Sequence, residues 1–261
     1  MIYPGLRPAP LFSMGFPVWI LSKRDIAANP AWAVCGALIH SVVLKAELSM
    51  RTRIKLCGLK QIAEVELADS LGADAIGLVF YPPSPRAVSV AEAAPLATAA
   101  GAFCTRVGLF VNPSVEDVEA VLARVPLDVL QFHGDETPDF CASFGRAWMK
   151  ALRVRDAQQL AADLESYSAA NSLLLDAYKA GEPGGTGETF NWNLIPERWR
   201  SRIILAGGLT PANVAQAVQQ VQPLGVDVSG GIEASKGIKS AEKMTEFVRQ
   251  VRLADSQRDI A

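Results

Sequence analysis

The sequence of 261 residues predicts a single (β/α)8 barrel, the α/β fold class also called the TIM barrel. From Arg51 onward, short apolar runs alternate with segments of helical spacing, as expected for buried parallel strands joined by helices. Two glycine turns end the series, and in this fold the loops after the seventh and eighth strands often bind phosphate. These turns are Ala206-Gly207-Gly208-Leu209 and Val228-Ser229-Gly230-Gly231.

The eight expected strands are short apolar runs bounded by turn residues. They are Ile54–Cys57, Ala75–Phe80, Thr105–Phe110, Val129–Phe132, Trp148–Ala151, Leu173–Asp176, Ile203–Ala206 and Gly225–Val228. An open doubly wound sheet usually has fewer strands and carries its glycine fingerprint after the first strand. Here the glycine pairs come last, which favours the closed barrel.

Helices are expected between these strands. Their ranges are 60–71, 89–101, 114–124, 136–144, 156–169, 191–197, 211–221 and 240–253. Asn112-Pro113-Ser114 and Leu209-Thr210-Pro211 place a capping residue or proline where a helix should begin. One long connection, 178–189, is rich in glycine, and its composition fits either a flexible loop or a lid that excludes water.

The first fifty residues lack this alternation and contain scattered prolines. Their longest uncharged apolar stretch, 31–44, is shorter than the roughly 20 residues that span a bilayer. Three interpretations are open: a start codon assigned too early, a disordered or loosely docked extension, or a targeting or membrane-associating segment. Strand-like sequence directly after Met50 favours the first. We expect an N-terminal extension over 1–50, the barrel over 51–255 and a C-terminal tail over 256–261.

The composition limits the partners. The net charge is −2, and no basic stretch predicts a nucleic-acid surface. Cys35, Cys57, Cys104 and Cys141 are widely spaced, without metal-ligand spacing or a dense disulfide framework. We therefore expect a cytoplasmic protein that binds a small phosphorylated molecule, with no nucleic-acid or membrane partner. Monomer and homodimer both remain open.

Three reactive side chains lie where strands end, which is where this fold places its active site. Cys57 is either a small buried hydrophobe or a base whose pKa is lowered by nearby cations; Lys55 lies on the same strand face. Asp176 follows three leucines, where an acid is costly to bury, and could be a cap or a general acid. Arg86, in a proline-rich loop, is either solvated or set to bind a carboxylate.

Two further segments are less informative. His133, with Gln131 at the end of the fourth strand, is a lone histidine of the kind that is more often structural, so we expect no proton transfer there. In the long connection, Gly185 and Thr186 could offer N–H groups to phosphate.

Taken together, these motifs resemble the phosphoribosylanthranilate isomerase family of tryptophan biosynthesis, from about residue 53 to residue 251. The first fifty residues have no counterpart in the family. The motifs that carry the resemblance are Lys55-Leu56-Cys57-Gly58, Ser84-Pro85-Arg86, Gln131-Phe132-His133-Gly134, Leu175-Asp176, Gly184-Gly185-Thr186-Gly187 and the two glycine turns, the second continuing to Ile232-Glu233.

The resemblance implies an Amadori rearrangement without a metal or organic cofactor. It assigns Asp176 as the general acid, Cys57 as the general base and Arg86 as the group that holds the anthranilate carboxylate. Phosphate binding falls to the backbone around Gly185, Thr186, Gly207, Gly208, Gly230 and Gly231.

Two other classes of protein are alternatives: a non-catalytic phosphate-binding barrel, or a different phosphate-binding barrel enzyme. Such an enzyme is a sugar-phosphate epimerase, an aldose–ketose isomerase of histidine synthesis or indole-glycerol-phosphate synthase. A metal-dependent epimerase would need His and Asp ligands, and the chain has only two histidines, His40 and His133. Indole-glycerol-phosphate synthase would need a lysine acid and additional glutamates near the barrel mouth, which the sequence pattern does not reveal. A non-catalytic phosphate-binding barrel would bind ligand without forming product.

Overall fold

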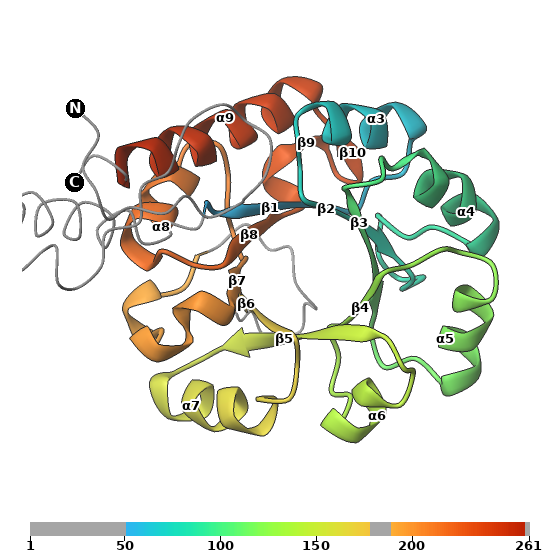
Figure 1. Cartoon of the computed structure of the whole chain (residues 1–261), viewed down its shortest axis with the longest axis horizontal. Coiled ribbons are helices and arrows are strands. Elements are labelled where there is room, and N and C mark those ends of the chain that lie inside the picture. The colour runs from blue at the N-terminus through green and yellow to red at the C-terminus, as the bar shows by residue number, and fades with distance from the viewer. Residues whose placement is uncertain (1–50, 178–188, 259–261) are drawn as a thin grey trace, which may run out of the picture. The chain divides into compact units, whose positions relative to one another are not determined.

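The computed structural model describes residues 51–177 and 189–258. In these ranges eight parallel strands close into one barrel in sequence order, and the helices form a ring outside it (Figure 1). The predicted (β/α)8 barrel is therefore confirmed. The N-terminal extension, most of the long connection, and the last three residues lie outside the described residues.

The strands agree closely with the sequence prediction. They are β1 Arg53–Cys57, β2 Ala75–Val79, β3 Thr105–Phe110, β4 Val129–Phe132, β5 Ala147–Val154, β6 Ser172–Ala177, β7 Ile203–Leu205 and β8 Gly225–Val228. Their apolar side chains are mostly buried, because helices cover the outer face of the strands and side chains fill the barrel. A few polar residues interrupt these apolar strands and are also buried: Lys55, Gln131, Lys150, Asp176 and Asp227.

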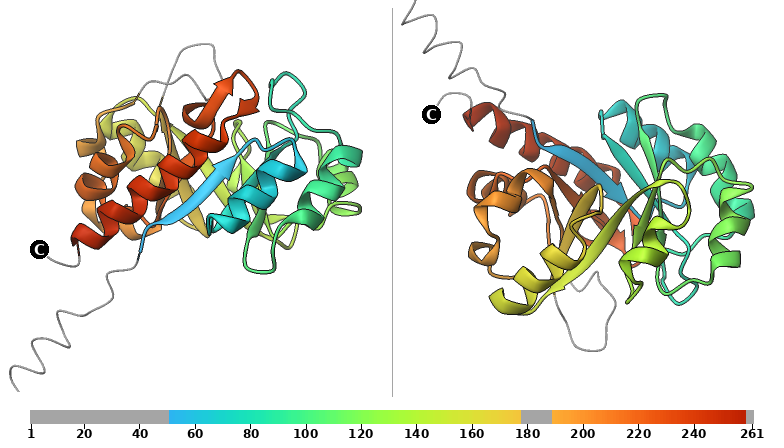
Figure 2. Two further views of the ribbon diagram at one scale, coloured as in Figure 1. Left: turned by 90° about the horizontal axis from the view of Figure 1, so that it is seen from above. Right: turned by 60° about the horizontal axis from the view of Figure 1, so that its bottom comes forward.

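The outer helices begin at recognisable caps. They are α3 Ile62–Ser70, α4 Val90–Ala99, α5 Val115–Leu122, α6 Pro138–Ala142, α7 Ala157–Ser166, α8 Val214–Val221 and α9 Ala241–Arg258. Ser89 and Ser114 form capping boxes at α4 and α5. Helix α9 runs beside β1 (Figure 2), and Asp255 accepts hydrogen bonds from the backbone and hydroxyl of Thr52. Within the described ranges, no helix has the length and apolarity needed to cross a membrane.

The helix expected over 191–197 was a wrong prediction. Two short 3-10 helices replace it, η1 Trp192–Leu194 and η2 Glu197–Arg202. Pro196 lies between them, and proline disfavours helical backbone in the residue before it. The preceding residue, Ile195, is indeed extended, with ψ 114°.

The helix expected over 240–253 is present as α9, but the segment between it and β8 has structure that the sequence did not predict. A 3-10 turn, η3 Gly230–Ile232, leads into a small hairpin of β9 Glu233–Ser235 and β10 Ile238–Lys239. Gly237 turns this hairpin with φ +83°. Helix α9 then continues through Arg258, so the first three residues of the expected tail, 256–258, are helical.

Candidate active site

The three predicted side chains lie on one side of the barrel, where strands lead into helices. Cys57 is the last residue of β1, Asp176 is the penultimate residue of β6, and Arg86 follows β2. In the closed strand order β7 and β8 separate β6 from β1. The sulfur and the carboxylate therefore belong to separate points of the mouth.

Cys57 is buried, and its side chain depends on a glycine in the neighbouring strand. A Cβ at Gly77 of β2 would lie 2.6 Å from the Cys57 sulfur. Such a contact is impossible, so glycine at this position makes the room that the thiol occupies. Any larger residue would push Cys57 out of place.

The electrostatics of Cys57 differ from the sequence expectation. Burial raises the pKa of the thiol, Lys55 and Lys239 act to lower it, and Asp227 acts to raise it, with a net increase. Lys55 does lie close to Cys57, but its ammonium also pairs with Asp227 of β8 at 2.7 Å, deep in the barrel. Lys55 and Lys239 thus offset part of the increase in the Cys57 pKa that burial causes, but the pKa stays above its ordinary value.

Asp176 is buried beside His133. The Asp176 Oδ2 atom lies 3.2 Å from His133 Nε2, while Oδ1 accepts a hydrogen bond of 2.9 Å from the backbone N–H of Ala177. On its other side, His133 Nδ1 lies 3.3 Å from the Gln131 amide nitrogen. Sequence reasoning expected no proton transfer at His133, yet the fold places this histidine against the candidate acid.

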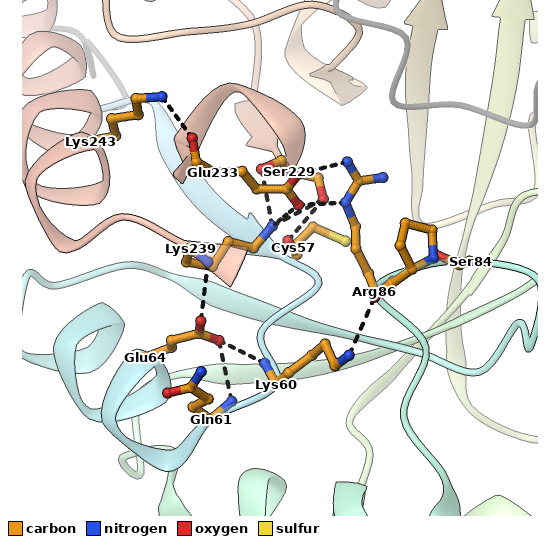
Figure 3. Close-up of polar contacts among 11 residues, drawn as sticks. Cys57, Lys60, Gln61, Glu64, Ser84, Arg86, Ser229, Glu233, Lys239 and Lys243 are labelled. Carbon is orange, nitrogen blue, oxygen red and sulfur yellow. Dashed lines mark hydrogen bonds and ion pairs between the residues drawn. The ribbon is translucent and has the colours of Figure 1, made fainter. Parts of the chain in front are cut away.

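Arg86 lies against Glu233, which follows the second glycine turn (Figure 3). Its Nε donates to Glu233 Oε1 at 2.6 Å and its Nη2 to Oε2 at 3.1 Å. The Glu233 carboxylate raises the pKa of Arg86, and Arg86 and Lys239 hold the pKa of Glu233 at about 2 despite burial. Arg86 is also close enough to Cys57 for the two groups to interact electrostatically.

The two glycine turns are neighbours in space. Gly231 packs so tightly against the Leu209 carbonyl of the first turn that no side chain would fit there. Gly207 has φ +77°, and a Cβ on it would lie 2.9 Å from Asp176 Oδ1. Glycine at 207 therefore serves the acid as well as the turn, a role that the sequence did not indicate. Gly185 and Thr186 lie outside the described residues.

Sequence reasoning singled out neither Asp227 nor Lys239, gave Glu233 no role of its own, and expected no proton transfer at His133. Asp227 carried a usable signal, because it is an acid within an apolar strand, as Asp176 is. Glu233 ends a motif that was already singled out. Lys239, whose ammonium lies 3.0 Å from Glu233, had no local signal in the sequence.

The comparisons with known proteins agree with this geometry. The family model of N-(5'phosphoribosyl)anthranilate (PRA) isomerase matches residues 54–250. An N-(5'-phosphoribosyl)anthranilate isomerase from Nitrosococcus oceani is 52% identical over 202 residues, covering 77% of this chain and 98% of the relative.

Two solved structures are also similar to the chain. Mutually generated monomers of the dimeric enzyme from Thermotoga maritima have 32% identity and a TM-score of 0.68. A structure of the isomerase with reduced 1-(o-carboxyphenylamino)-1-deoxyribulose 5-phosphate has the same identity and TM-score. Each match covers 77% of this chain and 98% of the solved chain. The chain therefore belongs to the N-(5'-phosphoribosyl)anthranilate isomerase family.

Proposed function

We propose that Asp176 and Cys57 carry out the isomerisation of N-(5-phosphoribosyl)anthranilate to 1-(2-carboxyphenylamino)-1-deoxyribulose 5-phosphate, a step of tryptophan biosynthesis. The observation that supports this assignment is the burial of one carboxylic acid and one thiol at separate strand ends of the same barrel mouth. The reaction needs an acid at one side of the sugar and a base at the other. General acid–base help is typically worth about 10²–10⁴-fold per group.

Asp176 is the acid in this proposal. Its Oδ1 is occupied by the Ala177 N–H, which leaves Oδ2, the atom beside His133, as the oxygen that carries the proton. Asp176 gives this proton to the ring oxygen of the ribose. The ring C–O bond breaks, and the nitrogen lone pair forms a protonated Schiff base at C1′.

Cys57 is the base. Its thiolate removes the proton from C2′, and the electron pair of that C–H bond forms the enolamine by neutralising the iminium nitrogen. Tautomerisation of the enolamine then gives the ketone. Lys55 and Lys239 favour the negative sulfur that this step needs, against the effect of burial.

Substrate binding is divided between two parts of the mouth. Arg86 recognises the anthranilate carboxylate, and the backbone N–H groups around Gly207, Gly208, Gly230 and Gly231 bind the phosphate. Gly185 and Thr186 belong to the same phosphate proposal by the family resemblance. A reduced thiol at Cys57 is consistent with a cytoplasmic location, and the dimeric relative makes a homodimer or a monomer the expected state.

The test follows the fluorescence of phosphoribosylanthranilate, generated from anthranilate and phosphoribosyl pyrophosphate by the preceding transferase. The full chain is expected to accelerate its decay beyond spontaneous hydrolysis. Cys57→Ser and Asp176→Asn should each lose about 10²–10⁴-fold in turnover while retaining their folded circular dichroism spectra. Near-normal turnover in either variant would remove the role proposed for that residue.

A further inference from the structure

Arg86 is held by a residue that is 147 positions away in the sequence. Glu233 binds it through two hydrogen bonds, one to each carboxylate oxygen, and the side chains of both residues are largely buried, with 14% and 7% exposed. Two bonds between a guanidinium and a carboxylate define the plane of the guanidinium as well as its position. The third nitrogen of Arg86, Nη1, has no hydrogen-bond partner among the residues that the structure describes.

Glu233 is itself held by two lysines of its own segment (Figure 3). Lys239 Nζ donates to Glu233 Oε1 at 3.0 Å and to the Ser229 carbonyl at 3.0 Å, and the Lys239 side chain is fully buried. Lys243 Nζ donates to the Glu233 carbonyl at 2.6 Å. The carboxylate therefore has little freedom to turn away from Arg86.

The hairpin that carries Glu233 and Lys239 is anchored on helix α3 and on the loop after β2. The backbone N–H of Lys239 donates to Glu64 Oε1 at 3.2 Å, while Glu64 Oε2 caps the start of α3 through the N–H of Lys60. At the tip, Gly237 lies so close to the carbonyl of Pro85 that a Cβ there would approach it to 2.7 Å. Pro85 directly precedes Arg86, so the hairpin packs on the loop that presents the guanidinium.

The cluster of Arg86, Lys239 and Glu233 has a net positive charge that can attract an anionic group of the ligand. Arg86 and Lys239 are positive and Glu233 is negative, so the three groups together carry one positive charge. Without Lys239, the Arg86–Glu233 pair would be neutral and would attract a carboxylate far less. Lys239 thus permits Glu233 to orient Arg86 without cancelling its attraction for an anion.

We propose that Glu233, supported by Lys239, is a positioning residue that orients Arg86 so that its remaining edge receives the carboxylate of the substrate's aromatic ring. This inference rests on the proposed role of Arg86. The competing hypothesis is that Glu233 pairs with Arg86 only in the free protein, and that the substrate carboxylate displaces Glu233 on binding. The two ideas predict opposite changes when the charge of Glu233 is removed.

The experiment compares two ligands on the full chain by titration calorimetry. One is reduced 1-(o-carboxyphenylamino)-1-deoxyribulose 5-phosphate, and the other is the same molecule without its carboxyl group. Glu233→Gln should weaken binding of the carboxylated ligand about tenfold or more and change binding of the other less than about twofold. Lys239→Met, which makes the cluster neutral, should also reduce the preference for the carboxylated ligand.

Kinetics and a matched control complete the test. Glu233→Gln should raise KM about tenfold with a smaller change in kcat, because orientation of Arg86 serves binding. The control is Glu246→Gln, which removes the carboxylate of the exposed Glu246–Arg249 pair on α9. This variant should bind both ligands with unchanged affinity. In an Arg86→Ala background, Glu233→Gln should have no further effect on the preference for the carboxylated ligand.

Each other outcome overturns a defined claim. Tighter binding of the carboxylated ligand by Glu233→Gln would show that Glu233 competes with substrate. Equal weakening of both ligands, or no change, would reject the positioning role while leaving the isomerase proposal intact. An Arg86→Ala variant that keeps its preference for the carboxylated ligand would reject both the role of Arg86 and this inference. Failure of the unaltered chain to bind either ligand, together with no turnover, would reject the proposed function itself.

Discussion

His133 Nε2 lies 3.2 Å from Asp176 Oδ2, although the two residues come from β4 and β6 with β5 between them. The Gln131 amide nitrogen approaches the opposite ring nitrogen at 3.3 Å. The imidazole is thus held between an amide and the proposed acid. We therefore expect His133 to help orient the Asp176 carboxyl group in the proposed reaction.

The first prediction concerns this contact. His133→Ala should lower kcat about 10–100-fold with a smaller change in KM, because Asp176 loses the group that orients its proton-bearing oxygen. Steady-state kinetics with the fluorescent substrate measure both constants. Asp135→Asn changes an exposed side chain of the same loop and should leave them unaltered. An unchanged kcat in His133→Ala would show that the contact has no catalytic effect.

The second prediction concerns pH. In the proposed reaction Cys57 acts as a thiolate, and burial raises the pKa of its thiol above the ordinary value. The kcat/KM should therefore rise with pH, and this rising limb should be centred above the ordinary thiol pKa of about 8.5. Lys239→Met removes one of the cations that lower the Cys57 pKa, so it should move this limb to still higher pH. A limb that is centred below about 8 in the unaltered chain would contradict the prediction.

The third prediction concerns stability in acid. Arg86 and Lys239 lower the pKa of Glu233 from 4.5 to about 2, against the opposing effect of burial. Glu233 therefore stabilises the fold fully above about pH 4.5, and this contribution is lost as the pH falls toward 2. The shift corresponds to at most about 3 kcal/mol, and solvent screening at the mouth reduces it to about 1–2 kcal/mol. Urea unfolding should show that the deficit of Glu233→Gln is largest at neutral pH and shrinks in acid. A deficit that does not depend on pH would contradict this assignment.

The fourth prediction concerns the buried ion pair of Lys150 and Glu136, whose charged atoms lie 2.6 Å apart. Glu136 also accepts hydrogen bonds from the N–H groups of Gly134 and Asn112. Lys150→Met should cost about 3–5 kcal/mol of unfolding free energy, because it leaves a buried carboxylate without its cation.

A matched control for that pair lies on the surface. Arg198 and Glu165 form an ion pair with side chains 71% and 59% exposed. Arg198→Met should cost no more than about 1 kcal/mol in the same denaturation experiment. Equal costs at the two sites would mean that burial does not determine the strength of the Lys150–Glu136 pair.

The fifth prediction concerns the N-terminal extension. Deletion of residues 1–49 should leave folding and turnover unchanged, because the family model matches only residues 54–250 and the barrel closes within the described residues. Thermal unfolding and the fluorescence assay compare the shortened and full chains. Loss of folding or activity in the shortened chain would overturn the prediction. That result, or a mature protein from cells that begins before Met50, would also contradict a start codon assigned too early.

The features that sequence reasoning predicted are those with a local cause. Strands such as Thr105–Phe110 and Val129–Phe132 were found with their exact bounds, because a parallel strand buried on both faces must be a short apolar run. The 3-10 helices around Pro196 were missed, since the helical spacing was given more weight than the proline. The hairpin Glu233–Lys239 was missed because its two strands are only three and two residues long.

By itself, the sequence determined the barrel and the strand ends that bear Cys57 and Asp176, because burial and turn formation depend on neighbouring residues. The tertiary structure alone decided which distant side chains meet at those ends. Glu233 reaches Arg86, His133 reaches Asp176, and burial outweighs Lys55 and Lys239 in the pKa of Cys57. These relationships depend on barrel closure and on distances between atoms far apart in the chain, and electrostatic energy varies steeply with such distances and with burial.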